Sequence, residues 1–195
     1  MSNNKHILKL GNIVKQELKN GSTNLVTRET GRIILDRIER EIREIGKGET
    51  LVLDFSDVKV IDYSCADEVI AKLITRLKGD EYGDKYVILQ NLSPSQKENI
   101  HVALERKDLA ILATTLDKNW EIIGILNNYL SETLQTIMKS GEISARELSD
   151  KLKLELNTAS TRLLNLHKSR LVKKSEVRTS DGRRQFVYRS LRGEL

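Results

Sequence analysis

The sequence contains a single cysteine, Cys65, among its 195 residues. A disulfide within one chain is therefore impossible, and a reducing, cytoplasmic compartment is the simplest expectation. Aromatic residues make up only 4% of the chain. So few aromatic side chains argue against a site that stacks bases and against an aromatic substrate pocket.

Long apolar runs and secretion signals are missing as well. No apolar run approaches the roughly 20 residues that a membrane-spanning helix needs. The first twelve residues, MSNNKHILKLGN, contain neither the apolar segment nor the small-residue cleavage site of a signal peptide. We therefore expect a protein that neither enters a membrane nor is secreted.

Recognisable catalytic and metal-binding patterns are also lacking. The three histidines, His6, His101 and His167, are far apart and do not have the spacing of metal ligands. The segment GKG at 46–48 resembles part of a phosphate-binding loop but lacks its G-x-x-x-x-G-K-[ST] frame, and no G-x-S-x-G sequence is present. These absences predict a protein that is not an enzyme and that uses neither a metal nor a cofactor.

The charge is distributed unevenly along the chain. Residues 1–116 contain 18 Lys and Arg and 18 Asp and Glu, and residues 117–155 contain 5 and 7. Residues 156–195 contain 10 and 3, a local net charge of +7 within a total of +5. Because these basic residues are interleaved with apolar residues at regular spacing, we expect a folded basic surface and not a disordered tail.

The first 116 residues alternate strand-like and helix-like segments. A helix is predicted over Thr27–Ile45, where Ile34, Ile38 and Ile42 fall on one face. The apolar run Leu51–Phe55 predicts a strand covered on both faces. The other predicted elements are a hairpin of His6–Leu10 and Ile13–Leu18 around Gly11-Asn12, helices over Ala66–Leu77 and Ser95–Arg106, and strands over Lys85–Leu92 and Leu109–Ala113. This alternation predicts a layered α/β domain.

Two domains are expected, joined by a short linker. Residues 1–116 are assigned to the α/β domain, 117–125 to the linker and 126–195 to a second domain. Within the linker, Trp120–Ile123 has two interpretations: a short strand, or the start of the next helix.

The most distinctive local sequence is LDFSDVKVIDYSCADE at residues 53–68, which runs from a strand through a turn to a helix start. It resembles STAS domains, the fold of anti-sigma factor antagonists and of sulfate transporter tails. Its Ser-x-Ala-Asp-Glu ending is similar to a STAS-like group of unassigned function. The resemblance places Ser64 where the antagonists carry a phosphorylated serine and Asp62 at the aspartate before it. Tyr63 and Cys65 depart from the serine and glycine of the family pattern.

Ser64 has two interpretations. It can cap the following helix, with Asp67 completing a capping box. Alternatively, it is a phosphorylation or partner site, although a phosphoryl group would be repelled by Asp62, Asp67 and Glu68. We favour the cap, because a helix that follows a strand needs one whatever its function. Cys65 is expected to be a buried small side chain and not a redox sensor.

The C-terminal part carries clear helix and hairpin signals. Ser144 and Glu147 predict a capping box, and Asn157 is expected to cap the next helix, Thr158–Ser169. Two strand-like segments with an Asp-Gly pair between them predict a hairpin: Leu171–Val177 and Gln185–Ser190, joined through residues 179–183. This order of elements resembles the winged helix-turn-helix of bacterial and archaeal repressors, including arsenic-responsive and multiple-antibiotic-resistance regulators. The predicted fold is thus a STAS-like α/β domain followed by an α+β winged helix-turn-helix domain.

The second resemblance implies a homodimer that binds double-stranded DNA and regulates transcription. Thr, Ser, Arg and Asn side chains on a helix can contact base edges, and cations suit the phosphate backbone. The candidate DNA contacts lie on the exposed face of the last helix and at the hairpin tip: Thr158, Ser160, Thr161, Arg162, Asn165, Lys168, Arg183 and Arg184.

The alternative function is a protein-interaction switch of the anti-sigma antagonist type. In that case the STAS-like domain would bind a regulatory kinase or ATPase, and the winged helix would dock protein instead of DNA.

Overall fold

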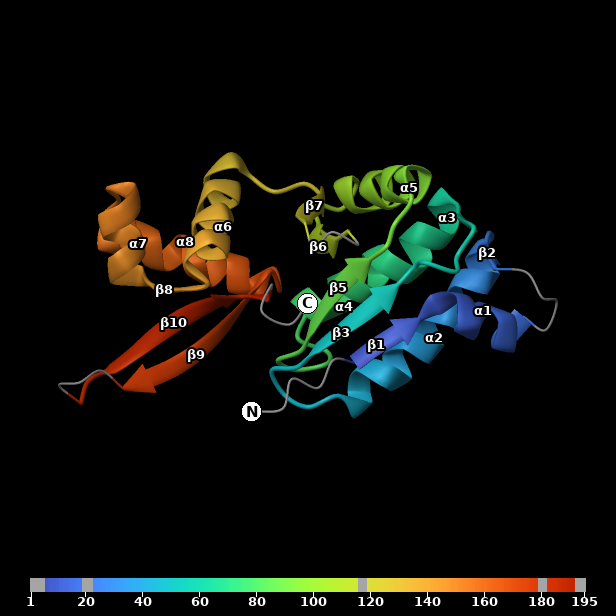
Figure 1. Cartoon of the computed structure of the whole chain (residues 1–195), viewed down its shortest axis with the longest axis horizontal. Coiled ribbons are helices and arrows are strands. Elements are labelled where there is room, and N and C mark those ends of the chain that lie inside the picture. Colours follow the sequence, from blue (N-terminus) through green and yellow to red (C-terminus); the bar gives the residue numbers. More distant parts are fainter. Residues whose placement is uncertain (1–5, 19–22, 116–118, 179–181, 192–195) are drawn as a thin grey trace. The chain divides into compact units, whose positions relative to one another are not determined.

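A computed structural model of the chain describes residues 6–18, 23–115, 119–178 and 182–191 (Figure 1). The chain divides into two compact units, Met1–Ile125 and Leu126–Leu195. No helix in the described ranges is long and apolar enough to cross a membrane.

The N-terminal unit is built on a five-stranded sheet with the order β1-β3-β5-β6-β7. The first four strands are parallel, and β7 at the edge is antiparallel to β6. The strands are β1 (His6–Lys9), β3 (Thr50–Asp54), β5 (Tyr86–Gln90), β6 (Ala110–Thr114) and β7 (Trp120–Gly124). Two short strands, β2 (Asn24–Leu25) and β4 (Val60–Ile61), form a separate parallel pair. The predicted α/β character is confirmed.

The helices of this unit pack into one core with alternate residues of the strands. That core includes Leu51, Leu53 and Val87 from the sheet and Ile34 and Ile38 from α2. Because successive strand residues point to opposite faces, this core lies on one face of the sheet. The helices are α1 (Leu10–Leu18), α2 (Arg28–Glu44), α3 (Tyr63–Ala66), the π-helical segment η1 (Asp67–Ala71), α4 (Lys72–Lys78) and α5 (Pro94–Glu105).

Most of the predicted elements of this unit are confirmed, including the fully buried strand β3. The predicted N-terminal hairpin is wrong, because β1 pairs in parallel with β3 and is followed directly by α1. A Cβ at Gly11 would lie 2.4 Å from the Asp57 Cβ, so this glycine permits close packing and does not form a turn. The predicted linker is also corrected, because its residues 120–124 form the edge strand β7.

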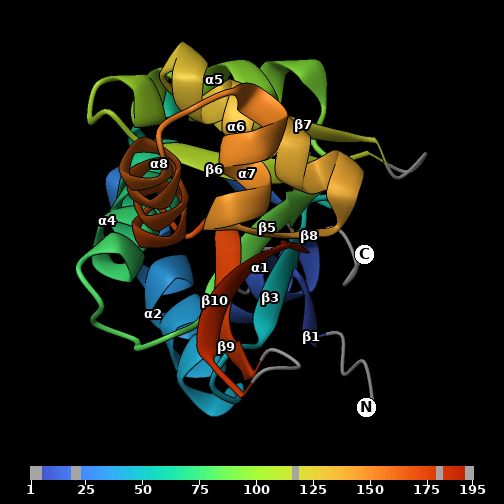
Figure 2. The ribbon, with the colours of Figure 1, turned by 90° about the vertical axis from the view of Figure 1, so that its left-hand side faces the viewer.

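The C-terminal unit contains three helices and a three-stranded antiparallel sheet of order β8-β10-β9 (Figures 1 and 2). Its elements are α6 (Asn128–Ser140), β8 (Glu142–Ser144), α7 (Ala145–Leu152), α8 (Leu156–Lys168), β9 (Val172–Arg178) and β10 (Arg184–Ser190). The two long strands form a hairpin that extends beyond the helices (Figure 2). The predicted turn residues Thr179–Asp181 lie outside the described residues.

Helix boundaries in this unit follow the sequence signals with one exception. The capping box of Ser144 and Glu147 is confirmed, with both hydrogen bonds present. The predicted cap at Asn157 is wrong: α8 begins at Leu156, two residues earlier than predicted, after Glu155 and without a side-chain cap. Asn157 lies inside the first turn, where its carbonyl accepts a hydrogen bond from the Thr161 hydroxyl.

A buried charged network connects α2 and α4 with the loop that follows α4. Glu39 is only 5% exposed. Its Oε1 accepts a hydrogen bond of 2.6 Å from the Tyr82 hydroxyl and also contacts Arg76, while Arg43 lies 3.4 Å from Oε2. Burial, followed by the hydrogen bond to Glu39, raises the pKa of Tyr82 to about 12 from its ordinary value of 10.0.

This raised pKa predicts a loss of stability in strong alkali. Tyr82 loses its proton near pH 10 in the unfolded chain and near pH 12 in the folded one. Deprotonation therefore favours the unfolded chain, and the free energy of unfolding should fall as pH rises from about 10 to about 12. The change Tyr82→Phe should remove that part of the fall. It should also cost about 1–2 kcal/mol at pH 7, because it deletes a hydrogen bond to a buried carboxylate.

Urea unfolding at pH 7, 10 and 11 measures both effects. Tyr63→Phe is the matched control in the same unit, because the Tyr63 hydroxyl bonds an exposed arginine, Arg106. An equal alkaline fall in wild type and Tyr82→Phe would contradict the assignment.

Candidate functional sites

The exposed side of α8 is fixed by the residues that it buries. Ala159, Leu163 and Leu166 are fully buried. The predicted contacts Thr158, Ser160, Thr161 and Lys168 are exposed, and Asn165 is half-buried. α8 therefore does present most of the predicted polar residues on one side of the unit.

Arg162 is placed differently from the prediction. Its side chain is only 16% exposed, and its guanidinium lies 3.1 Å from the Glu132 carboxylate of α6. It also lies 5.3 Å from the centre of the Tyr129 ring. Arg162 therefore joins α8 to α6 and is not part of the exposed stripe.

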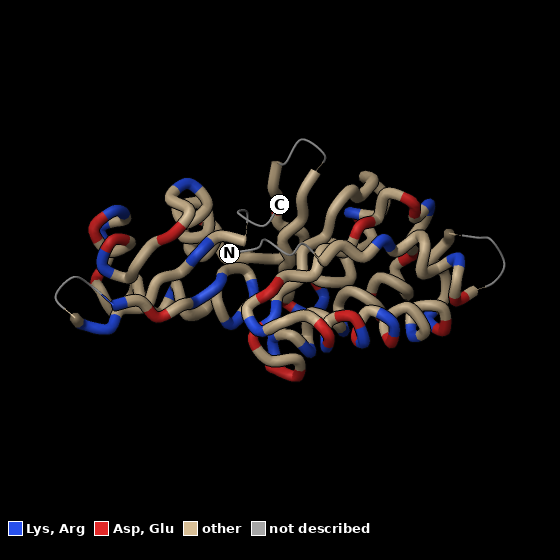
Figure 3. The backbone as a smooth tube through the Cα atoms, turned by 60° about the horizontal axis from the view of Figure 1, so that its bottom comes forward, with Lys and Arg blue, Asp and Glu red and all other residues tan. Residues whose placement is uncertain are grey.

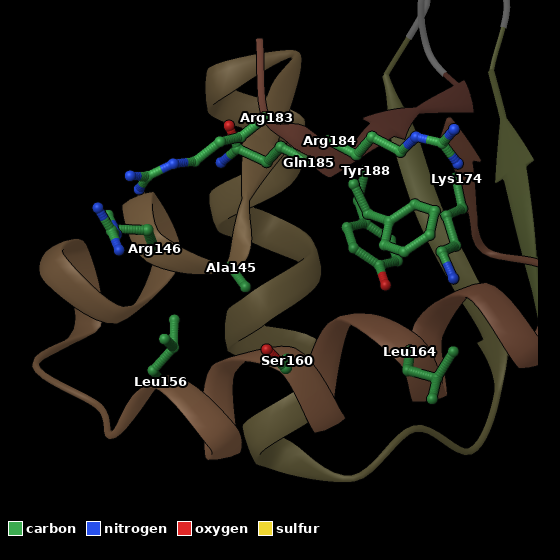
Figure 4. A pocket seen from close by; sticks show the side chains of 11 residues that line it. Ala145, Arg146, Leu156, Ser160, Leu164, Lys174, Arg183, Arg184, Gln185 and Tyr188 are labelled. Carbon is green, nitrogen blue, oxygen red and sulfur yellow. The ribbon is translucent and has the colours of Figure 1, made fainter. Parts of the chain in front are cut away.

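A groove of about 710 Å³ lies between α8, the start of α7 and the hairpin (Figure 4). Leu156, Ser160 and Leu164 line it from α8, and Phe186 and Tyr188 line it from β10. Leu156 and Phe186 are 46% and 50% exposed, so much of this lining is apolar and open to solvent.

Basic side chains line this groove from α7, from both hairpin strands and from the residue before β10: Arg146, Lys174, Arg184 and Arg183. Lys174 Nζ lies 3.9 Å from the centre of the Phe186 ring. Arg184 is paired with Glu176 at 3.3 Å but remains 75% exposed. The sequence predicted three of the lining residues, Ser160, Arg183 and Arg184, and did not indicate the others. The i, i+4, i+8 spacing of residues 156, 160 and 164 was the available signal.

In the N-terminal unit, Asp62 organises the turn between β4 and α3. Its Oδ1 accepts hydrogen bonds from the Cys65 backbone N–H at 2.7 Å and from the Ser64 hydroxyl at 3.0 Å. Its Oδ2 accepts a bond from the Thr27 N–H at 3.4 Å. The predicted cap is therefore wrong: Asp62 caps the helix, and Ser64 lies within its first turn.

Asp67 and Glu68 form a buried acidic pair below this turn. They are 7% and 1% exposed. Asp67 is therefore not part of a capping box. Basic residues from α2, α4 and the turn after α5 surround the pair. These ion pairs join Arg28 to both acids (3.4 and 3.5 Å), Arg32 to Glu68 (3.5 Å), Lys72 to Glu68, and Lys107 to Asp67 (2.7 Å).

Two unusual backbone features lie beside this acidic pair. Both acids lie in the π-helical turn η1, a feature that often marks functional positions. Thr27 has φ 80°, a strained conformation for a β-branched residue. A Cβ at Gly31 would lie 2.9 Å from the Glu68 Cβ, so α2 and η1 approach each other as closely as a glycine allows.

Cys65 is fully buried between the same elements. Burial, helped by the nearby charges of Asp62 and Glu68, raises the pKa of the Cys65 thiol to about 12. The reactive thiolate is therefore absent at neutral pH, in line with the expected structural role. Across the described ranges, no group of three or more His, Cys, Asp or Glu side chains is placed to hold a metal ion.

Comparison with known protein families identifies part of this unit. Residues 30–97 match the family model of a STAS-like domain of unknown function (DUF4325). The match runs from the start of α2 into α5 and includes the turn at Asp62 and the buried acidic pair. No curated protein and no solved structure matches the chain.

The STAS-like domain thus contains both N-terminal features that the sequence singled out. Ser64, the predicted phosphorylation or partner site, is half-buried and donates its hydroxyl proton to Asp62. Tyr63 packs beside it under Arg106, whose guanidinium lies 4.7 Å from the ring centre.

The hydrogen bonds around Asp62 predict a clear order of mutational effects. Asp62→Ala should lower the free energy of unfolding by about 1–2 kcal/mol, because it removes the helix cap and leaves two backbone N–H groups without their acceptor. Ser64→Ala should change it by no more than about 0.5 kcal/mol. Urea unfolding of both variants, with Asp62→Asn as the variant that keeps one oxygen acceptor, measures this order. The cap assignment fails if Ser64→Ala is the more costly change.

Proposed function

We propose that this chain is a DNA-binding transcriptional regulator without catalytic activity, metal or cofactor. In this proposal residues 126–195 form a winged helix-turn-helix that binds double-stranded DNA as a homodimer. The STAS-like domain supplies the sensory or partner-binding function.

The observation that carries the proposal is the order and pairing of the C-terminal elements. A helix, a short strand, two helices joined by the turn at residues 153–155, and a long hairpin follow one another. The short strand β8 pairs with β10 of that hairpin. This combination matches the design of a winged helix, in which α8 is the recognition helix and β9–β10 is the wing.

The charge of the C-terminal unit supports the same function. Residues 126–195 contain 14 Lys and Arg and 8 Asp and Glu, whereas residues 1–125 contain 19 and 20. The net charges are therefore +6 and −1. Basic residues occur along both wing strands (Figure 3). Positive charge gathered on one unit is the footprint expected for binding to a phosphate backbone.

The buried face of α8 indicates which of its residues could contact DNA. The positions opposite Ala159, Leu163 and Leu166 would face the major groove: Asn157, Thr161, Leu164 and Lys168. Thr158, Ser160 and Asn165 flank this stripe. Arg162 leaves the set because it pairs with Glu132. In the wing, Arg183 and Arg184 would contact the sugar-phosphate backbone.

The second candidate is a protein-interaction switch, in which the STAS-like domain binds a kinase or ATPase and the C-terminal unit docks protein. One observation favours it: the solvent-open apolar lining of the groove at Leu156 and Phe186. Salt dependence separates the two candidates, because counterion release is specific to binding of a polyanion.

We expect binding to duplex DNA that weakens steeply with salt. Lys168→Ala and Arg183→Ala should each reduce the slope of log affinity against log salt concentration by about 0.9, because each removes one phosphate contact. Fluorescence anisotropy with labelled duplexes between roughly 50 and 200 mM salt measures the slope. Arg37→Ala on α2 of the N-terminal unit is the control and should leave the slope unchanged. Absence of binding to any duplex at low salt would refute the DNA proposal.

A further inference from the structure

Leu164 is an apolar residue in the middle of an otherwise polar stripe. It follows Asn157 and Thr161 and precedes Lys168 on the side of α8 opposite the buried residues. It is half-buried and lines the groove together with Leu156, two turns earlier (Figure 4). The core of the unit does not require Leu164, because Ala159, Leu163 and Leu166 already fill the buried side.

The charges around the groove indicate which occupant it accepts. Arg146, Lys174, Arg183 and Arg184 surround the apolar lining, and Glu176 is the acidic residue paired with one of them. A polyanion complements such a rim, and the α8 side of the groove belongs to the proposed recognition helix. Double-stranded DNA is therefore the occupant that the charges favour.

Duplex DNA offers few apolar groups to such a helix. The edges of the base pairs in the major groove present hydrogen-bond donors and acceptors, and the one apolar group among them is the C5 methyl of thymine. A leucine side chain gains nothing from a donor or acceptor, and it would bury a polar edge without a partner. It gains free energy by covering a methyl group.

We propose that Leu164, with Leu156 as a second apolar contact at the start of α8, selects thymine in the DNA sequence that this protein binds. This inference rests on the proposed function and adds the base that the site prefers. Thr161 and Asn157 would supply the polar contacts beside it, and Lys168 would hold the backbone.

The test begins with selection of bound sequences from a library of random duplexes by the full-length protein. Each thymine of the selected duplex is then replaced by uracil, which removes the methyl group and keeps every hydrogen-bonding atom. Covering one methyl group corresponds to about fourfold in affinity. We expect a loss of about this size at one or two positions in each half-site and none at the remaining thymines.

Two variants show which residue makes this discrimination. Leu164→Ala should abolish the difference between thymine and uracil at the position that Leu164 covers, leave any difference due to Leu156 in place, and keep the wild-type salt slope. Lys168→Ala should weaken both duplexes equally and reduce the salt slope, so it is the matched control. Thermal unfolding monitored by circular dichroism confirms that both variants fold. The wild-type comparison of thymine with uracil decides the matter even if Leu164→Ala is unstable.

The outcomes distinguish failure of the DNA-binding proposal from failure of the thymine proposal. If no duplex is selected or bound at low salt, the DNA proposal itself fails, and a protein partner becomes the better occupant of the groove. If a duplex is bound but every uracil replacement leaves the affinity unchanged, the thymine proposal is overturned while DNA binding stands. A thymine preference that is unchanged at every sensitive position in Leu164→Ala would also overturn the role of Leu164.

Discussion

The structure of the STAS-like domain depends on keeping the charge of Glu68 compensated. A carboxylate that is 1% exposed would destabilise the fold strongly if it had no partner. Its partners are Arg28 and Arg32 of α2 and Lys72, which lies one turn further along the same helical segment. These basic side chains are partly exposed to solvent, whereas the carboxylate is buried. The negative charge therefore lies inside the domain and the positive charges lie at its surface. α2 must therefore lie against η1, and Gly31 makes that approach possible.

This constraint connects the strained backbone with the turn that carries Asp62. Thr27 adopts its unfavourable conformation immediately before Arg28, which forms ion pairs with Asp67 and Glu68. The strained backbone therefore lies next to a residue that compensates the buried charge. The Thr27 N–H bonds Asp62, which in turn caps the helix containing Glu68. Strain of this kind persists where the surroundings over-determine the geometry. The positions of Thr27, Ser64 and the start of the helix are therefore all fixed by hydrogen bonds to the same carboxylate, Asp62.

Much of this fold could be predicted from the sequence where the signal was local and periodic. The helix over 27–45, the buried strand at 51–55 and the capping box at Ser144 each depend on neighbouring residues alone, and all are confirmed. Two of the errors arose where a residue distant in the sequence determines the local structure. Gly11 suggested a turn, but it serves packing against Asp57. Asp62 outcompetes Ser64 as the cap because its carboxylate also reaches Thr27 across the β2–β4 pair.

The same distinction applies to the candidate contacts on α8. A helical wheel drawn from the sequence separates the buried side from the exposed side, and it does so correctly for Ala159, Leu163 and Leu166. It could not show that Arg162 would pair with Glu132, because nothing in the α8 sequence identifies α6 as its neighbour. Removing that arginine from the exposed set leaves a stripe that is less basic than the sequence suggested. Cations of α7 and of the wing then supply most of the positive charge around the groove. In the proposed DNA-binding function, α7 and the wing would therefore supply most of the attraction to a polyanion, and α8 would discriminate between bases. Because Lys168 would be the one cation among the described residues on the exposed side of α8 and most of the charge would come from other elements, α8 can include an apolar residue such as Leu164 without weakening the electrostatic contribution to the proposed binding.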